Sequence, residues 1–138
     1  MFVDSGAWIA ILVPDDRHHL EAQTSLASLI RRRLPLITTN HVVGETYSWL
    51  MRSAGHAVAW RFKNDIDGSE RLEVVTADQK LERQAWEILR KFDDQAFSFI
   101  DAVSFALMRQ RRLRRAFAFD QHFATAGFDR IPLDVPAD

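Results

Sequence analysis

The chain of 138 residues lacks cysteine, which excludes a disulfide framework and any zinc or iron site with cysteine ligands. It also lacks an apolar run long enough to cross a bilayer, and Asp4 stands where a signal peptide would be apolar. Glycine and proline are scarce, with five and four residues, whereas 47% of the residues are hydrophobic. We therefore expect one packed domain over residues 1–138, located in the cytoplasm and without membrane contact.

A strong net charge is missing as well, since 18 basic and 19 acidic residues give a formal charge of −1. This balance excludes a globally basic coat for nucleic acid, but it permits a local basic patch. Arginines are clustered in "IRRRL" (30–34) and "RQRRLRR" (109–115), and guanidinium groups suit bidentate contacts with phosphate. Cations that complement the dipole at a helix end would give the same pattern. With two clusters in one small domain, the two interpretations are balanced.

Short apolar runs alternate with longer amphipathic segments along the chain. Five runs are typical of buried strands: 1–4, 34–39, 72–77, 115–120 and 131–135. Four segments have apolar residues at helical spacing: 17–32, 41–53, 55–66 and 78–92. Asp78 is the expected N-cap of the last of these helices. Strands that alternate with helices indicate a parallel sheet covered on both faces, so the sequence predicts a three-layer α/β/α domain.

Two of the predicted strands end in an aspartate, Asp4 in the first and Asp120 in the fourth. In open parallel sheets, ligands bind beyond the carboxyl ends of the strands, so both carboxylates are candidates for a binding site. An aspartate at a strand–helix junction often caps the helix that follows, and for either residue alone capping is the simpler interpretation.

A third carboxylate, Asp101, lies in the most apolar stretch of the chain, "SFIDAVSFALM" (98–108). Ser98 is a good N-cap, which makes Asp101 the N3 residue of a capping box. The residues after Asp101 are apolar almost all round a helix, so Asp101 and Ser104 form one narrow polar face. We expect this face to line a cleft in which Asp101 approaches Asp4 and Asp120.

Glu45 is a fourth candidate, within the predicted helix 41–53. The neighbouring Gly44 costs about 1 kcal/mol relative to alanine in a helix interior, which suggests a close backbone approach or open access there. Taken alone, Glu45 is an ordinary solvated glutamate. His122, two residues after Asp120, could also reach the strand ends, although a solvated histidine is the simpler interpretation.

The four acids lie in the segments "MFVDSGAWIAIL", "TTNHVVGETYSWLMR", "FSFIDAVSFALM" and "AFAFDQHFATAGF". In order and spacing, these segments resemble the PIN-domain family, and within it the VapC-type toxin ribonucleases of toxin–antitoxin pairs. The resemblance covers essentially the whole chain. The metal-binding acids of the family map onto Asp4, Glu45, Asp101 and Asp120. The resemblance also implies a PIN-like sheet in the order 3-2-1-4-5, which would bring these four acids together.

The resemblance implies a metal-dependent endoribonuclease that hydrolyses RNA phosphodiester bonds. Mg²⁺ takes oxygen ligands, as does Mn²⁺, which should be able to replace it, so a carboxylate site fits these ions better than zinc. Asp4 and Asp101 would be the central ligands, while Asp120 and Glu45 would bind the ion directly or through water. Such an ion can activate a water molecule and stabilise the charge that develops on the phosphate.

The resemblance further implies a homodimer and an antitoxin partner with a segment that crosses the active-site cleft. The arginines Arg111, Arg112 and Arg114 are candidates for contacts with the RNA substrate. Three residues are weaker candidates for supporting the acids: Ser5, Asp94 and Ser98.

Two positions depart from the family pattern. Many relatives carry a hydroxyl two residues after the first aspartate, where this chain has Gly6. Relatives also often have Thr or Ser two residues before the last aspartate, where this chain has Ala118. In the relatives, side chains at these two positions support the acids. We therefore expect Gly6 and Ala118 to affect the catalytic rate and the role of Asp120. All four acids are retained.

Three other functions compete with a nuclease. A phosphoryl-accepting receiver domain needs a lysine at a late strand end, but the only lysines are Lys63, Lys80 and Lys91. A haloacid-dehalogenase-type phosphatase needs D-x-D after the first strand, where this chain has "DSG". A PIN-like module that binds RNA or protein without cutting is the remaining alternative, but a phosphate-binding surface gains nothing from four uncompensated acids.

Overall fold

The computed structural model describes residues 1–137 and contains one sheet of five parallel strands in the order β3-β2-β1-β4-β5. The strands are β1 (Phe2–Val3), β2 (Leu36–Thr39), β3 (Leu72–Val75), β4 (Arg115–Phe117) and β5 (Asp129–Ile131). The predicted strand order and the predicted parallel pairing are therefore confirmed.

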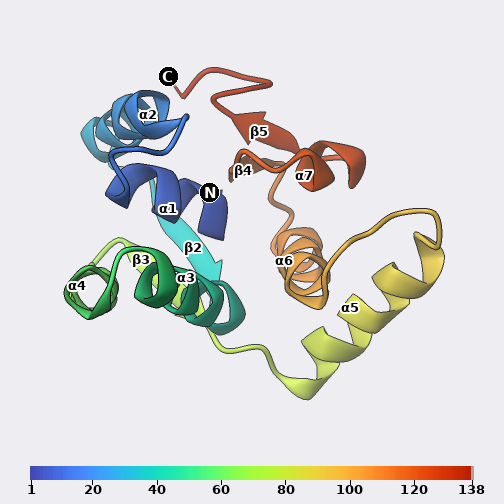
Figure 1. Cartoon of the computed structure of the whole chain (residues 1–138). Coiled ribbons are helices and arrows are strands. Elements are labelled where there is room, and N and C mark those ends of the chain that lie inside the picture. The colour runs from blue at the N-terminus through green and yellow to red at the C-terminus, as the bar shows by residue number, and fades with distance from the viewer. Residues whose placement is uncertain (138) are drawn as a thin grey trace.

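Helices connect the strands and cover both faces of the sheet. They are α1 (Ser5–Leu12), α2 (His19–Arg31), α3 (Asn40–Ser53), α4 (His56–Asp67), α5 (Gln79–Lys91), α6 (Phe99–Gln110) and α7 (Gln121–Thr125). Figure 1 shows α1 to α4 on one side of the sheet and α5 and α6 on the other, which confirms the three predicted layers. No helix within residues 1–137 has the length and the apolar character that a membrane span requires.

The central strands supply side chains to two apolar layers, because successive residues of a strand point to opposite faces. Phe2 and Ala116 belong to the layer beneath α5 and α6, whereas Val3 and Phe117 belong to the layer beneath α1 and α2. Helix α6 is enclosed, since every residue from Ala102 to Met108 is buried. The predicted burial of both flanks of this helix is confirmed, and it holds the first turn of α6 at the carboxyl edge of the sheet.

Several predicted strand boundaries were wrong. The fourth strand ends at Phe117 instead of residue 120, and the last strand precedes most of the segment 131–135, where the chain turns. Phe117 is the last residue of β4 to pair with either neighbour, opposite Val3 of β1 and Ile131 of β5, and its carbonyl accepts a hydrogen bond from the Asp4 backbone N–H at 3.0 Å. The second strand begins two residues later than predicted and the third ends two residues earlier.

The predicted helices agree with the structure to within two residues at each end. Asp78 caps α5 as predicted, because its Oδ1 accepts a hydrogen bond from the Leu81 backbone N–H at 2.8 Å. An aspartate at this position leaves one fewer unpaired N–H in the first turn of the helix.

Candidate metal centre

The four predicted acids come from four different elements at the carboxyl edge of the sheet. Asp4 directly follows β1, Glu45 lies in α3 after β2, Asp101 lies in the first turn of α6, and Asp120 directly precedes α7 after β4. The carboxyl ends of parallel strands meet at one edge, which explains the convergence. The carboxyl group of Asp4 experiences the negative charges of the other three acids, so the four form one electrostatic cluster.

Asp4 is the buried member of the cluster, with 5% of its surface exposed. It is the N-cap residue of α1, but its side chain makes no capping hydrogen bond, so the capping interpretation is wrong for this residue. Burial, and then the charges of the other acids, raise the pKa of Asp4 to about 7, against a hydrogen bond from the Ser5 backbone N–H. A nearby cation would favour the ionised form.

Asp101 is held in place by the predicted capping box. The Asp101 backbone N–H donates to Ser98 Oγ at 3.0 Å, and the Ser98 backbone N–H donates to Asp101 Oδ2 at 2.9 Å. The predicted cap is thus confirmed. Ser104, in contrast, is fully buried and donates to the Ile100 carbonyl within the helix at 3.0 Å, so the expectation that it lines a cleft was wrong.

Asp120 caps α7, because its Oδ1 accepts a hydrogen bond from the His122 backbone N–H at 2.9 Å. The capping interpretation therefore holds for this residue. Capping does not exclude a second role, since a carboxylate has two oxygens and only Oδ1 is used by the helix. Potential ligand atoms of Asp101, Asp120 and His122 all lie within 4.8 Å of one another.

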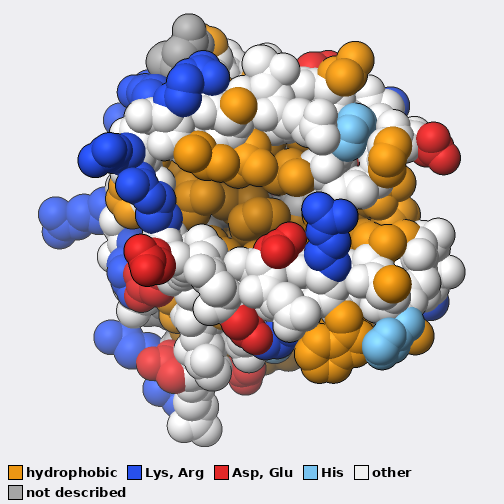
Figure 2. Space-filling model, turned by 90° about the vertical axis from the view of Figure 1, so that its left-hand side faces the viewer, with side chains coloured by type: hydrophobic (Ala, Val, Ile, Leu, Met, Phe, Trp, Pro, Cys, Tyr) orange, Lys and Arg blue, Asp and Glu red, His pale blue; other side chains and the backbone are white. Residues whose placement is uncertain are grey.

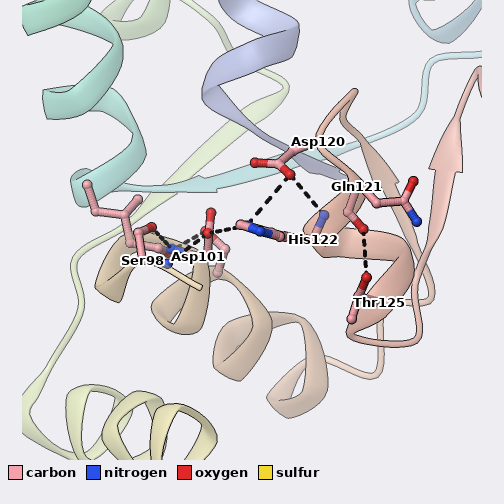
Figure 3. A network of polar contacts seen from close by, with 8 residues as sticks. Ser98, Asp101, Asp120, Gln121, His122 and Thr125 are labelled. Carbon is pink, nitrogen blue, oxygen red and sulfur yellow. Dashed lines mark hydrogen bonds and ion pairs between the residues drawn. The ribbon is translucent and has the colours of Figure 1, made fainter. Parts of the chain in front are cut away.

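His122 completes this group, and the interpretation as a solvated histidine was wrong. Its Nδ1 lies 3.1 Å from Asp101 Oδ2 and 3.7 Å from Asp120 Oδ1, and Figure 3 shows the ring between the two carboxylates. The ring is 30% exposed and packs edge-on against Phe97, with the ring centres 5.1 Å apart. The sequence signal for this contact was the D-x-H spacing at the start of a helix. This spacing places the histidine beside the aspartate that caps the same helix.

Glu45 is exposed and lies outside this close group, although its charge acts on Asp4. It is carried by α3, which starts where Thr39 Oγ1 accepts a hydrogen bond from the Val42 backbone N–H at 3.1 Å. Gly44 beside it is also exposed, and a Cβ there would meet nothing within 4 Å. The interpretation that another backbone segment approaches Gly44 closely is therefore wrong. The alternative interpretation, that Gly44 leaves open access to this part of the helix, agrees with the structure.

The weaker candidates have different positions. Ser5 supplies the backbone N–H that opposes the raised pKa of Asp4, and Ser98 caps α6. Asp94 is exposed in the loop before α6 and has no side-chain hydrogen bond or ion pair within residues 1–137. A Cβ at Gly6 would lie 3.9 Å from Asp4 Oδ2, so the position that departs from the family pattern has room for a side chain beside the acid.

The three arginine candidates lie far from the acids. Arg111, Arg112 and Arg114 are exposed and follow the C-terminal end of α6, whereas Asp101 lies at its start. Ten residues of helix separate the ends by about 15 Å. Arg111 is engaged in an ion pair with Glu73 at 2.8 Å.

The donor set fits a hard divalent cation. Its acidic side chains offer carboxylate oxygens, which suit Mg²⁺ and Mn²⁺, and the His122 imidazole lies beside two of them. Within residues 1–137, no lysine or arginine nitrogen lies within 4.0 Å of a carboxylate oxygen of the four acids, although Arg130 interacts with the charge of Asp120 from farther away. His122 is the only basic side chain within that distance. The buried Asp4 carboxyl thus has three negative neighbours and no permanent positive one, a distribution of charge that a bound cation would balance.

Comparisons with known proteins agree with this geometry. The family model for the PIN domain matches residues 1–129. The chain is 42% identical over 137 residues to the 23S rRNA-specific endonuclease VapC20 of Mycobacterium tuberculosis, in strains CDC 1551 and H37Rv, and the match covers 95% of this chain and 97% of VapC20. The crystal structure of M. tuberculosis VapC20, a sarcin–ricin loop cleaving toxin, matches with a TM-score of 0.87 and 38% identity, over 94% of this chain and 97% of that one.

The raised pKa of Asp4 predicts a pH dependence of stability without metal. The folded protein holds this proton more tightly than the unfolded chain, so its free energy of unfolding should fall from about pH 4 to about pH 7 and then level off. Asp4→Asn should remove that fall, with a gain over wild type at pH 8 of at most about 4 kcal/mol. Urea unfolding in EDTA at several pH values measures both. Asp15→Asn, at an exposed acid, is the control, and parallel curves for wild type and Asp4→Asn would contradict the prediction.

Proposed function

The chain belongs to the PIN-domain family as a VapC-type member, and from this premise we propose that it is a metal-dependent endoribonuclease toxin of a toxin–antitoxin pair. The observation that carries the proposal is the buried Asp4 carboxyl, which has three further acids as neighbours and, within residues 1–137, no lysine or arginine whose charge acts on it. We treat residues 1–138 as one PIN domain, because β5 completes the sheet just beyond the matched region.

In this proposal, Asp4 and Asp101 are the central ligands of Mg²⁺, for which Mn²⁺ can substitute. Asp120 and the exposed Glu45 bind the ion directly or through water. When bound, the ion supplies an acidified water as nucleophile and positive charge for the phosphate. The chain itself orients Asp101 through the capping box, keeps Asp4 away from solvent, and leaves Glu45 open to incoming RNA and water.

The substrate in this proposal is RNA. VapC20, at 42% identity, is named for 23S rRNA, and its crystal structure is that of a sarcin–ricin loop cleaving toxin. We propose the sarcin–ricin loop as the first RNA to test with this chain. A cleft of about 740 Å³ is lined by Asp120 and by two arginines, Arg17 and Arg130, together with two further acids, Asp16 and Glu21. We propose that the arginines guide a phosphate backbone along this cleft to Asp120.

The cleavage test uses a sarcin–ricin loop RNA with Mg²⁺ or Mn²⁺. Asp101→Asn should lower the rate by about a hundredfold or more, because removing a ligand costs at least as much as removing a supporting residue. EDTA should abolish cleavage by the wild type. Asp93→Asn, at an exposed acid in the loop before α6, is the control and should cleave normally. Full cleavage in EDTA would contradict the metal mechanism, and absence of cleavage with retained RNA binding would favour the non-cutting module.

The arginine clusters extend the proposal to RNA binding away from the acids. Arg32, Arg112, Arg114 and Arg115 line one cavity of about 370 Å³, so the two clusters of the sequence meet at one surface. This surface lies at the amino ends of the strands, opposite the acids. We propose that it contacts a part of a folded RNA that lies beyond the cleavage site.

Replacing Arg111, Arg112 and Arg114 by glutamine should therefore weaken RNA binding and reduce its salt dependence. The slope of log K against log salt should shrink by about 0.7 to 0.9 for each phosphate that the protein no longer neutralises. The rate at saturating RNA should stay close to that of wild type. A control with the same net charge replaces the scattered, exposed Arg52, Arg61 and Arg83. Two outcomes would remove this surface from the proposal: an equal decrease in RNA affinity in both triple variants, or an unchanged affinity in the variant that lacks Arg111, Arg112 and Arg114.

We propose that the antitoxin, besides the segment that the resemblance places across the active-site cleft, lays a second, apolar segment into the groove between α2 and α4. Figure 2 shows this hollow, with its hydrophobic side chains exposed on one face of the molecule. The groove has a volume of about 210 Å³, and its lining includes Trp8, Ile11, Leu26, Ile30, Phe62 and Ile66. An amphipathic segment that lays its apolar face into such a groove would bury surface that is otherwise exposed to water. The homodimer remains a prediction from the family resemblance, and the cytoplasmic location remains a prediction from the composition of the chain.

Ile30→Asp tests this partner. The side chain is 57% exposed and lines the groove, so a charge there should leave the fold intact and oppose the binding of an apolar segment. Co-expression with the cognate antitoxin should restore growth in cells that make the wild type but not in cells that make Ile30→Asp. Leu20→Asp is the matched control, because Leu20 is 78% exposed on the same helix and lies outside the groove. Normal rescue of Ile30→Asp would place the antitoxin elsewhere.

A further inference from the structure

We propose that His122 is a positioning residue, which clamps Asp101 and Asp120 so that each keeps one free oxygen for the metal ion. The inference rests on the proposed function, since it concerns the same acids. His122 contacts both carboxylates through two different groups, its imidazole and its backbone N–H. Figure 3 shows these contacts converging from the first turn of α7.

Each of the two acids has one carboxylate oxygen that accepts hydrogen bonds from the chain and one that does not. Asp101 Oδ2 accepts from the Ser98 backbone N–H at 2.9 Å and lies 3.1 Å from His122 Nδ1. Asp120 Oδ1 accepts from the His122 backbone N–H at 2.9 Å and lies 3.7 Å from Nδ1. Asp101 Oδ1 and Asp120 Oδ2 have no hydrogen-bond partner within residues 1–137. One oxygen of each acid is thus held by the chain, and the other is available to a cation.

The chemistry of the contact assigns the imidazole tautomer. An ionised carboxylate only accepts hydrogen bonds, so the contact with Asp101 Oδ2 requires a hydrogen on His122 Nδ1. A nitrogen that carries a hydrogen has no lone pair for a metal. His122 therefore acts through Asp101 and Asp120, although its Nδ1 is close enough to them to be a ligand itself.

Packing holds the ring at this place. The imidazole lies edge-on against Phe97, which is buried and packs in turn against Phe105 of α6. The next residue, Phe123, is fully buried and anchors α7 in the same apolar layer. Packing against the apolar core thus fixes the position of the His122 Nδ1 donor. The ring therefore needs little reorganisation to hold the two carboxylates.

A histidine suits this clamp better than a lysine or arginine. Two carboxylates with potential ligand atoms within 4.8 Å repel each other, and a hydrogen-bond donor between them offsets part of that repulsion. A lysine or arginine would do so with a permanent positive charge, which would compete with the cation for the same acids. An imidazole can donate the same hydrogen bond without carrying a permanent positive charge.

The test compares three substitutions of His122. His122→Phe keeps an aromatic ring against Phe97 and removes the side-chain donor. His122→Asn puts an amide N–H close to the position of Nδ1, and His122→Gln puts it closer to that of Nε2. All three keep the backbone N–H to Asp120, so they isolate the imidazole contact.

Calorimetric titration with Mn²⁺ and with Mg²⁺ gives the expected pattern. His122→Phe and His122→Gln should weaken the binding of both ions by about tenfold or more, as the removal of supporting residues does, whereas His122→Asn should stay within about threefold of wild type. Unchanged affinity in His122→Phe would overturn the clamp. A decrease confined to Mn²⁺ would also overturn it, because it would mark the imidazole as a ligand. If the wild type binds neither ion, the proposed function fails, and the clamp fails with it.

A second measurement on the wild type does not depend on how the variants fold. Long-range ¹H–¹⁵N correlation spectra report which ring nitrogen carries the hydrogen. At a pH where imidazoles are neutral, His122 should carry it on Nδ1, both without metal and with saturating Mg²⁺. A hydrogen on Nε2 in the metal-free protein, or its departure from Nδ1 when Mg²⁺ binds, would overturn the clamp.

Discussion

The burial of the Asp4 carboxyl beside three other acids is the constraint on which the rest of the structure depends. Burial and mutual repulsion both favour its protonated form, and they raise its pKa to about 7. A fold selected only for stability would place a neutral residue there. This chain instead ends β1 after two residues, so that Asp4 stands at the point where the strands open into helices. The resulting charge cluster is unfavourable without a cation, and that is the basis of a metal site.

The surrounding architecture holds the acids against their repulsion. Parallel strands bring Asp4 and Asp120 to one edge, and the buried helix α6 fixes the depth at which Asp101 stands. The capping box and His122 then restrict the rotation of the Asp101 carboxylate. The capping box uses a backbone N–H group, and His122 uses its imidazole and its backbone N–H, where a lysine or arginine would bring a permanent positive charge. The cluster thereby keeps a negative potential for a divalent cation, in a protein whose net charge is close to zero.

The layers, the strand order and the caps of α5 and α6 could be predicted, because periodicity and capping act over a few residues. The ends of β4 and β5 could not, because they depend on pairing with neighbouring strands, and the apolar run to Phe119 continues past the last paired residue of β4. The position of His122 was missed for a related reason. Its contact with Asp101 joins two helices far apart in the sequence, and local spacing shows only its bond to Asp120.

The central claim is that these acids bind a hard divalent cation at the carboxyl edge of the sheet. Crystals of the wild type grown with Mn²⁺, with data collected at the manganese absorption edge, test it most directly. The account predicts an anomalous peak within bonding distance of carboxylate oxygens of Asp4 and Asp101, and no peak there in crystals of Asp101→Asn. A wild-type map without a peak at these residues, or a peak that persists unchanged in Asp101→Asn, would contradict the account.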